Sequence, residues 1–168
     1  MAEAFGISPD GSRAGVITFS YYSEHSIKMR DHMDIKSFQA AVNAIPLMGS
    51  TTRIDKALRL TQAELFKPEF GGRPGIPKLL LLLTDGSQTM DAGHEHPGLI
   101  ADELRDEGII IIVVGIGKGT NQTELEHMAG GAENAFSAQS FDELIGGEFV
   151  KLMMERSCEE GRCKLDCL

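Results

Sequence analysis

The run of five leucines from Leu79 to Leu83 constrains the fold of this chain more than any other feature. It is too short to span a membrane, and it lies between Pro77 and the triplet Thr84-Asp85-Gly86. An uninterrupted apolar run of this length, without alternating polar residues, is typical of a strand buried on both faces of a sheet. We therefore expect a central strand that is covered on both sides.

An acidic residue, Asp85, follows the leucine run almost at once. It stands where the strand ends, and open α/β sheets bind their ligands at the carboxyl ends of their strands. Asp85 is therefore the first candidate for a functional residue. The alternative is an Asp-Gly turn that ends the strand and does nothing more.

The rest of the chain alternates between apolar runs and segments with helical periodicity. Asp34, Asn121 and Ser140 are expected N-caps, and residues 1–7 resemble the last turns of a helix that closes near Gly6. The alternation predicts an α/β fold with a doubly wound, mostly parallel sheet and helices on both faces. The expected strands are 14–20, 24–29, 79–84, 109–115 and 134–137, and the expected helices are 34–45, 52–66, 97–107, 122–129 and 141–156.

Length and composition exclude several classes of function. A chain of 168 residues is most simply one domain with a substantial core. Its net charge of -9 argues against non-specific nucleic-acid binding, which needs a basic surface. No apolar stretch is long enough for a membrane span. Catalysis is not indicated either, because no serine has a G-x-S-x-G context and residues 1–157 contain no cysteine.

All three cysteines, Cys158, Cys163 and Cys167, lie within the last eleven residues. A body without cysteine that is followed by a cysteine-rich tail predicts the edge of a disulfide-bonded extracellular region. Because three is odd, at least one of them stays free or pairs outside this chain. A metal-binding tail is the alternative, but the spacing matches no common zinc pattern.

One N-x-T sequon occurs, at Asn121-Gln122-Thr123. It lies where a loop enters a predicted helix, so a glycan on Asn121 would be exposed if the chain is secreted. Asn121 could equally serve only as the helix cap.

Two loops expected at one end of the sheet are rich in oxygen ligands. One contains Gly49-Ser50-Thr51-Thr52, and the other contains Thr84-Asp85-Gly86-Ser87. Hydroxyls and carboxylates suit a hard divalent cation such as Mg²⁺, Mn²⁺ or Ca²⁺. Parallel topology would bring such loops to one edge of the sheet, where they could share an ion.

Taken together, these motifs resemble the von Willebrand factor type A domain family, which includes the integrin inserted domains. The resemblance covers roughly residues 4–156, and it is specific because the motifs occur in combination and in order. The matching segments are GSTTRIDKAL (49–58), LLLLLTDGSQ (79–88), GIIIIVVGIG (108–117) and FSAQSFDEL (136–144).

The resemblance implies a metal-ion-dependent adhesion site that is built from three loops. Alignment on the following helix matches Thr52 to the threonine ligand of the family, with Thr51 as the fallback, and Asp85 matches the aspartate of the third loop. The implied function is non-enzymatic: an extracellular adhesion or matrix domain that recognises a protein ligand such as collagen through Mg²⁺ or Mn²⁺, with Ca²⁺ also suitable.

The chain departs from the family in one large respect, because it contains no Asp-x-Ser-x-Ser motif. We therefore expect residues 1–156 to be a domain that lacks its first, central strand and most of its first helix. Met1 would then be an internal methionine, and residues 157–168 a tail or linker. Ion affinity in this chain should be weak or absent, because at most two of the expected ligands remain. Alternatively, the strands pair differently or borrow a strand from a neighbour.

Two other functions remain open at this point. An intracellular domain of the same fold could act as a scaffold in a multiprotein complex, in which case the cysteines would be reduced. A nucleotide- or flavin-binding enzyme on a doubly wound sheet is the third reading. It is the weakest of the three, because Gly115-Ile116-Gly117-Lys118-Gly119 lacks both the P-loop spacing and the dinucleotide fingerprint.

Overall fold

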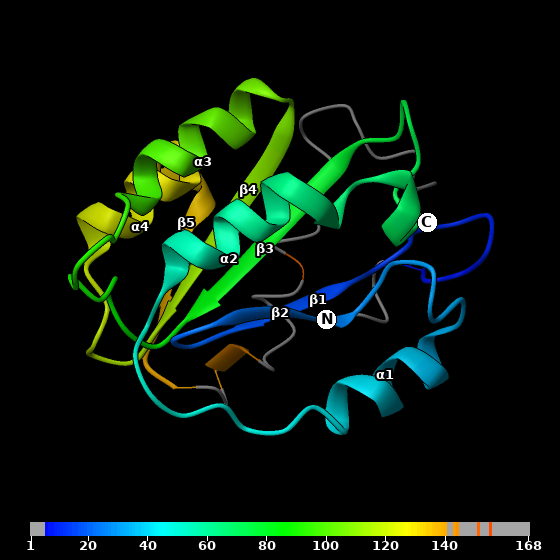
Figure 1. Ribbon diagram of the computed structural model, residues 1–168, viewed down its shortest axis with the longest axis horizontal. Coiled ribbons are helices and arrows are strands. Elements are labelled where there is room, and N and C mark those ends of the chain that lie inside the picture. Colours follow the sequence, from blue (N-terminus) through cyan, green and yellow to red (C-terminus); the bar gives the residue numbers. More distant parts are fainter. Residues whose placement is uncertain (1–5, 141–142, 145–150, 152–154, 156–168) are drawn as a thin grey trace. The chain divides into compact units, whose positions relative to one another are not determined.

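The computed structural model describes residues 6–140, 143, 144, 151 and 155 (Figure 1). The chain forms two compact units, the first from residues 1–76 and 88–97 and the second from residues 77–87 and 98–168. Within the described residues, no helix has both the length and the apolar character that crossing a membrane requires.

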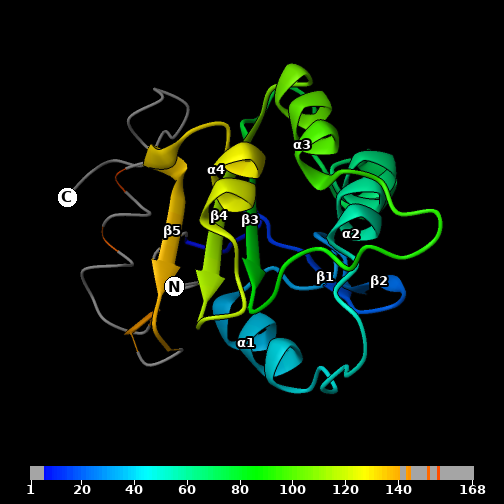
Figure 2. The same ribbon diagram turned by 90° about the vertical axis from the view of Figure 1, so that its left-hand side faces the viewer.

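The first unit is built around an antiparallel hairpin. Strand β1 (Val16–Phe19) pairs with strand β2 (Ser23–Ile27), and both lie close to the expected strands 14–20 and 24–29. The hydroxyls of Thr18 and Ser26 share a hydrogen bond of 2.7 Å across the two strands. Figures 1 and 2 show helix α1 (Ile35–Asn43) on one side of this hairpin and helix α2 (Ile54–Leu60) on the other. The hairpin is thus covered on both faces within its own unit.

Helix α1 begins at the cap that the sequence predicted. The carboxylate of Asp34 accepts a hydrogen bond of 2.9 Å from the Ser37 amide, which satisfies one of the unpaired amides of the first turn. Phe38 is buried against Ile7 and Ile27, and this contact fixes α1 on the hairpin. Val42 is four residues along α1 from Phe38 and so lies on the same side of the helix, but it is exposed. The face that the helix buries is therefore narrower than the sequence pattern suggests.

The sequence predicted one regular helix over residues 52–66. The regular helix α2 ends before Phe66. It changes into a π-helical segment, η2 (Thr61–Leu65), and the chain then forms a short 3-10 helix, η3 (Pro68–Phe70). The Thr61 hydroxyl donates to the Ala57 carbonyl at 2.9 Å, where the two helical types meet. Such π-bulges depend on packing and leave little trace in hydrophobic periodicity.

His25 of β2 is enclosed by this irregular segment. Its side chain is 8% exposed, its ring stacks on Phe70 with 4.6 Å between centroids, and its Nε2 lies 3.3 Å from a carboxylate oxygen of Glu64. Burial lowers the pKa of His25 below its ordinary value of 6.5, and nearby Lys28 lowers it further, although Glu64 acts in the opposite direction. The folded protein therefore prefers the neutral imidazole.

We expect the free energy of unfolding to fall between pH 7 and pH 5, partly through His25. Because its pKa is lower in the folded state, the unfolded chain binds the proton more readily below pH 6.5, and stability is lost as the pH falls. Urea unfolding at both pH values should show a smaller loss for His25→Phe, which keeps a ring against Phe70. An equal loss in the two proteins would exclude His25 as a source.

The second unit is a parallel sheet. Its strands are β3 (Lys78–Thr84), β4 (Ile109–Ile116) and β5 (Ala135–Ala138), in that order. Every residue of β4 is buried, as its apolar sequence predicted. Helix α4 (Gln122–Ala129) contacts both β4 and β5.

Helices α3 (Pro97–Asp106) and α4 are joined by polar contacts within the second unit. Arg105 of α3 donates to the Met128 carbonyl of α4 at 2.5 Å and also pairs with Asp102. Asp102 in turn lies 3.3 Å from Nε2 of His127. This cluster fixes the C-terminal half of α3 to α4.

The prediction that the leucine strand is buried on both faces is wrong. In β3, Leu82 is 4% exposed but Leu83 is 41% exposed, and Leu79 to Leu81 are only partly buried. The difference from β4 follows from position in the sheet. Among the described strands, β4 lies between two partners, whereas β3 pairs with β4 alone. The described strands form two sheets, β1-β2 and β3-β4-β5.

Several predictions fall on residues outside the described part of the chain. These are most of the closing helix at 141–156, the N-terminal residues 1–5, and the cysteines Cys158, Cys163 and Cys167.

Candidate functional site

The loop that carries Thr52 is fixed by backbone hydrogen bonds within the first unit. The Thr52 carbonyl accepts from the Thr89 amide at 2.8 Å, and the Thr52 amide donates to the Thr89 hydroxyl at 2.9 Å. The next residue, Arg53, donates its amide to the Ser20 carbonyl at 3.1 Å. Three segments therefore meet at Thr52 and Arg53, which limits the conformations that the loop can adopt.

Thr51, the fallback metal ligand, carries a buried hydroxyl oxygen that has no hydrogen-bond partner among the described residues. A buried hydroxyl without a partner costs free energy, so this atom could accept a bond from a ligand. It is an oxygen donor of the kind that hard cations prefer.

Asp85 lies in the second unit, at the carboxyl end of β3, and it is exposed. The Thr84 hydroxyl donates to the Gly86 carbonyl at 2.7 Å, and the Ser87 hydroxyl donates to the Gly119 carbonyl at 3.3 Å. Gly119 itself passes close to the backbone, because a Cβ built there would lie 2.5 Å from the Asp85 carbonyl oxygen. The Asp85 loop is thus supported by the loop after β4.

Thr52 and Asp85 fit a hard cation by their chemistry but do not complete a coordination sphere. They belong to different units, and each is described within its own. The described residues contain no group of three or more His, Cys, Asp or Glu side chains that could hold a metal ion.

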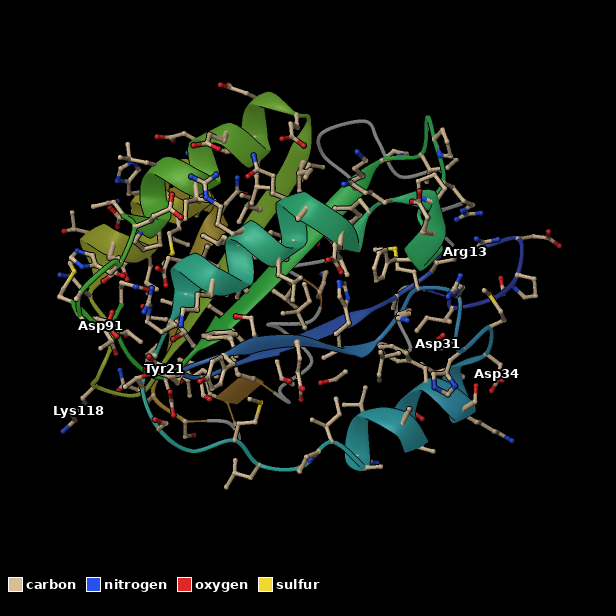
Figure 3. The ribbon with its side chains drawn as sticks, viewed as in Figure 1. Arg13, Tyr21, Asp31, Asp34, Asp91 and Lys118 are labelled. Carbon is tan, nitrogen blue, oxygen red and sulfur yellow. The ribbon has the colours of Figure 1, made fainter. Side chains whose placement is uncertain are left out.

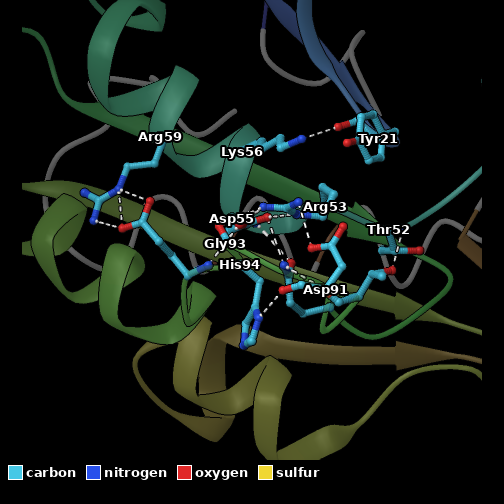
Figure 4. Close-up of polar contacts among 12 residues, drawn as sticks. Tyr21, Thr52, Arg53, Asp55, Lys56, Arg59, Asp91, Gly93 and His94 are labelled. Atoms are coloured by element: carbon cyan, nitrogen blue, oxygen red, sulfur yellow. Dashed lines mark hydrogen bonds and ion pairs between the residues drawn. The ribbon is translucent and has the colours of Figure 1, made fainter.

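The strongest polar cluster of the first unit follows Thr52 directly and was not predicted. Arg53 binds Asp55 through two parallel hydrogen bonds, Nε to Oδ1 at 2.8 Å and Nη2 to Oδ2 at 2.6 Å (Figure 4). Its remaining Nη1 donates to Asp91 at 2.8 Å. Both Arg53 and Asp55 are buried, with exposed fractions of 4% and 2%.

Further donors complete the environment of the Asp55 carboxylate. The Gln88 amide group donates to Oδ1 at 2.9 Å, and the backbone amide of Glu95 donates to Oδ2 at 3.1 Å. The Glu95 side chain itself pairs with Arg59, with 2.6 Å between Nη2 and Oε2. Asp55 therefore holds α2 to the segment that contains Gln88 and Glu95.

The cluster shifts the pKa values of Asp55 and Arg53 in the directions that favour the charged form of each side chain. Burial alone would raise the pKa of Asp55, but the hydrogen bonds from Arg53, Glu95 and Gln88 outweigh it and lower the pKa well below its usual range. The pKa of Arg53 is raised, mainly by its hydrogen bond to Asp55. A buried ion pair is therefore charged under all ordinary conditions.

Sequence patterns could not reveal this cluster. Arg53 and Asp55 are two residues apart near the start of a predicted helix. A charged pair at such a position is typical of a helix face exposed to solvent. Asp91 and Glu95 are 38 and 40 residues away from their partners. Such distant pairs leave no periodic signal.

Asn121 caps α4, as the sequence predicted. Its side-chain oxygen accepts hydrogen bonds from the Thr123 amide at 3.0 Å and the Glu124 amide at 3.4 Å. The residue is exposed. The cap uses the oxygen of the side-chain amide, and its nitrogen makes no hydrogen bond within the described residues.

Comparison with known proteins identifies relatives among matrix proteins. The human collagen alpha-6(VI) chain is 35% identical over 138 residues, which cover 82% of this chain. The chain spans only 6% of the length of that collagen.

Among solved structures, proximal thread matrix protein 1 from the mussel byssus superposes with a TM-score of 0.80 and 29% identity. The match covers 88% of this chain and 37% of that protein. A second structure of the same protein, described as having a zinc-occupied MIDAS motif, gives a TM-score of 0.78 and 28% identity. It covers 92% of this chain and 39% of that protein.

The sequence model of the von Willebrand factor type A domain matches residues 1–149, nearly nine tenths of the chain. The parallel sheet flanked by helices, the relatives and the solved structures agree with this match. The chain belongs to the von Willebrand factor type A domain family.

Proposed function

We propose that this chain is a non-enzymatic, extracellular protein-binding domain that recognises a matrix protein such as collagen. The observation that carries the proposal is the family membership together with relatives that are themselves collagen chains and a thread matrix protein. The net charge and the lack of a nucleophile motif agree with a binding role. An extracellular location also fits the proposed disulfide bonding of Cys158, Cys163 and Cys167.

A divalent cation is proposed to take part through Thr52 and Asp85, with Thr51 as the fallback ligand. Three observations support this part of the proposal: the backbone of Thr52 is held in place, the Thr51 hydroxyl has no partner within the part of the chain that the structure describes, and Asp85 is an exposed carboxylate at a strand end. A relative at 28% identity has zinc at the corresponding kind of site. A bound cation would supply positive charge that attracts a carboxylate of the ligand.

Cation binding to this chain should be weak, because the sequence lacks the Asp-x-Ser-x-Ser ligands. In calorimetric titration with Mg²⁺ or Mn²⁺, we expect a dissociation constant above about 1 mM, the weak end of extracellular metal sites. Tight binding of one ion would show that other residues complete the site.

The function is tested by binding of the full chain to immobilised collagen, in Mn²⁺ and in EDTA. We expect saturable binding that Mn²⁺ strengthens, and we expect Asp85→Ala to abolish only the gain from Mn²⁺. Asp106→Ala, which removes another exposed carboxylate, is the matched control and should behave like the unmodified chain. Absence of collagen binding in both conditions would refute the proposal.

Asn121 is proposed to carry an N-linked glycan, because the residue is exposed and the cap uses its side-chain oxygen rather than its nitrogen. Secretion from eukaryotic cells should give a chain whose mass falls after peptide N-glycosidase treatment. Thr123→Ala should abolish this change, whereas Thr123→Ser should retain it. An unglycosylated secreted chain would leave Asn121 with the cap as its only role.

A further inference from the structure

Two exposed tyrosines stand at the turn between β1 and β2 in the first unit. Tyr22 is 70% exposed and Tyr21 is 43% exposed. Their rings meet edge to face, with 4.8 Å between centroids and an interplanar angle of 88°. Large aromatic side chains are costly to leave in water, and they concentrate at protein interfaces.

The tyrosine pair is held by Lys56 of α2. Its ammonium group lies 4.2 Å from the centroid of the Tyr21 ring and 5.4 Å from that of the Tyr22 ring. It also donates a hydrogen bond of 2.6 Å to the Tyr21 carbonyl, which Figure 4 shows. These contacts favour the ring positions seen here, which would reduce the conformational entropy lost when a partner binds.

The turn is anchored to the same loop as the proposed cation ligand. Ser20 precedes the tyrosines, and its carbonyl accepts from the Arg53 amide. Tyr21 and Thr52 accordingly lie at the same end of the polar cluster in Figure 4, and Figure 3 shows Tyr21 at the end of the hairpin away from Asp34. Met90, which is also exposed, follows Thr89, whose hydroxyl accepts a hydrogen bond from the Thr52 amide.

The chemistry of this surface favours one kind of ligand. A polyproline II segment has no internal hydrogen bonds, so its carbonyls are open to donors and its proline rings pack on aromatic faces. The two tyrosines offer aromatic ring faces on which proline rings can pack, and hydroxyl groups that can donate hydrogen bonds to carbonyls. Lys56 forms no ion pair with a carboxylate in the described part of the chain, and it therefore adds a positive charge that suits an acidic side chain.

We propose that Tyr21, Tyr22 and Lys56 form a docking surface for an acidic, proline-rich segment in the polyproline II conformation. Collagen strands have this backbone conformation. The inference thus rests on the proposed function and names the part of the surface that such a ligand contacts. It does not require the cation.

The test uses two probes and the full chain. The first probe is a single-stranded peptide with glutamate among prolines, and the second is immobilised triple-helical collagen, both in EDTA. Tyr21→Ala/Tyr22→Ala should weaken binding of both probes at least about tenfold, the effect typical of aromatic anchors. Lys56→Met should weaken binding of the acidic peptide but not of the same peptide with glutamine in place of glutamate. Val42→Ala, an exposed apolar residue on α1, is the control and should leave binding unchanged.

The outcomes separate this inference from the proposed function. Peptide binding that depends on the tyrosines supports the docking surface, even if collagen does not bind and the proposed function fails. Collagen binding that is equal in the unmodified chain and the double variant supports the proposed function and overturns the docking surface. Failure of both probes to bind the unmodified chain overturns both. Circular dichroism establishes that each variant is folded.

Discussion

Replacing Asp55 with alanine is expected to lower the free energy of unfolding by about 3–5 kcal/mol, the usual cost of removing one partner of a buried ion pair. The guanidinium of Arg53 would lose two hydrogen bonds in a site where it is only 4% exposed. Gln88 and the Glu95 amide would lose an acceptor as well. Urea unfolding at pH 7 measures the change.

Two variants show whether the loss of stability in Asp55→Ala comes from the Arg53 charge that is left buried without its partner. Asp91→Ala removes an Arg53 partner that is partly exposed, and it should cost about 1 kcal/mol or less. The double variant Arg53→Met/Asp55→Leu removes both charges and should be more stable than Asp55→Ala alone, because no uncompensated buried charge remains. A double variant that is less stable than the single one would refute this account.

The elements of the fold could be predicted because they depend on local patterns. The caps Asp34 and Asn121 stand next to the amides that they satisfy, and the apolar run at 109–115 forms most of β4. Asp85 was already a candidate from its place after the leucine run, and the resemblance to the family matched both Asp85 and Thr52 to metal ligands. Those assignments stay predictions.

The polar cluster and the burial of β3 could not be predicted, because both depend on neighbours far along the chain. Arg53 finds Asp91 only because the loop after β3 returns to α2. The leucines of β3 form the same kind of uninterrupted apolar run as the isoleucines of β4. The burial of each strand, however, depends on the number of strands and helices that surround it. The docking surface likewise needs the fold, because Lys56 and Tyr21 are 35 residues apart.

Replacing Leu82 with alanine should lower the free energy of unfolding by about 2–5 kcal/mol, whereas Leu83→Ala should cost about 1 kcal/mol or less. The two residues have the same chemistry and are neighbours on β3, where they pair in register with Val113 and Val114. Successive side chains of a strand point to opposite faces. Leu82 is 4% exposed and Leu83 is 41% exposed, so only the first substitution leaves a cavity.

This pair of variants also tests the original interpretation of the leucine run. If β3 were buried on both faces, as its sequence suggested, the two substitutions would cost the same within about 1 kcal/mol. Equal and large losses in urea unfolding would therefore mean that the face of Leu83 is covered in solution. A large loss for Leu82→Ala alone would show that the leucine run can form a strand with only one buried face. Leu83→Ser separates the cases further, because a buried hydroxyl without a partner would add to the loss, whereas an exposed one would not.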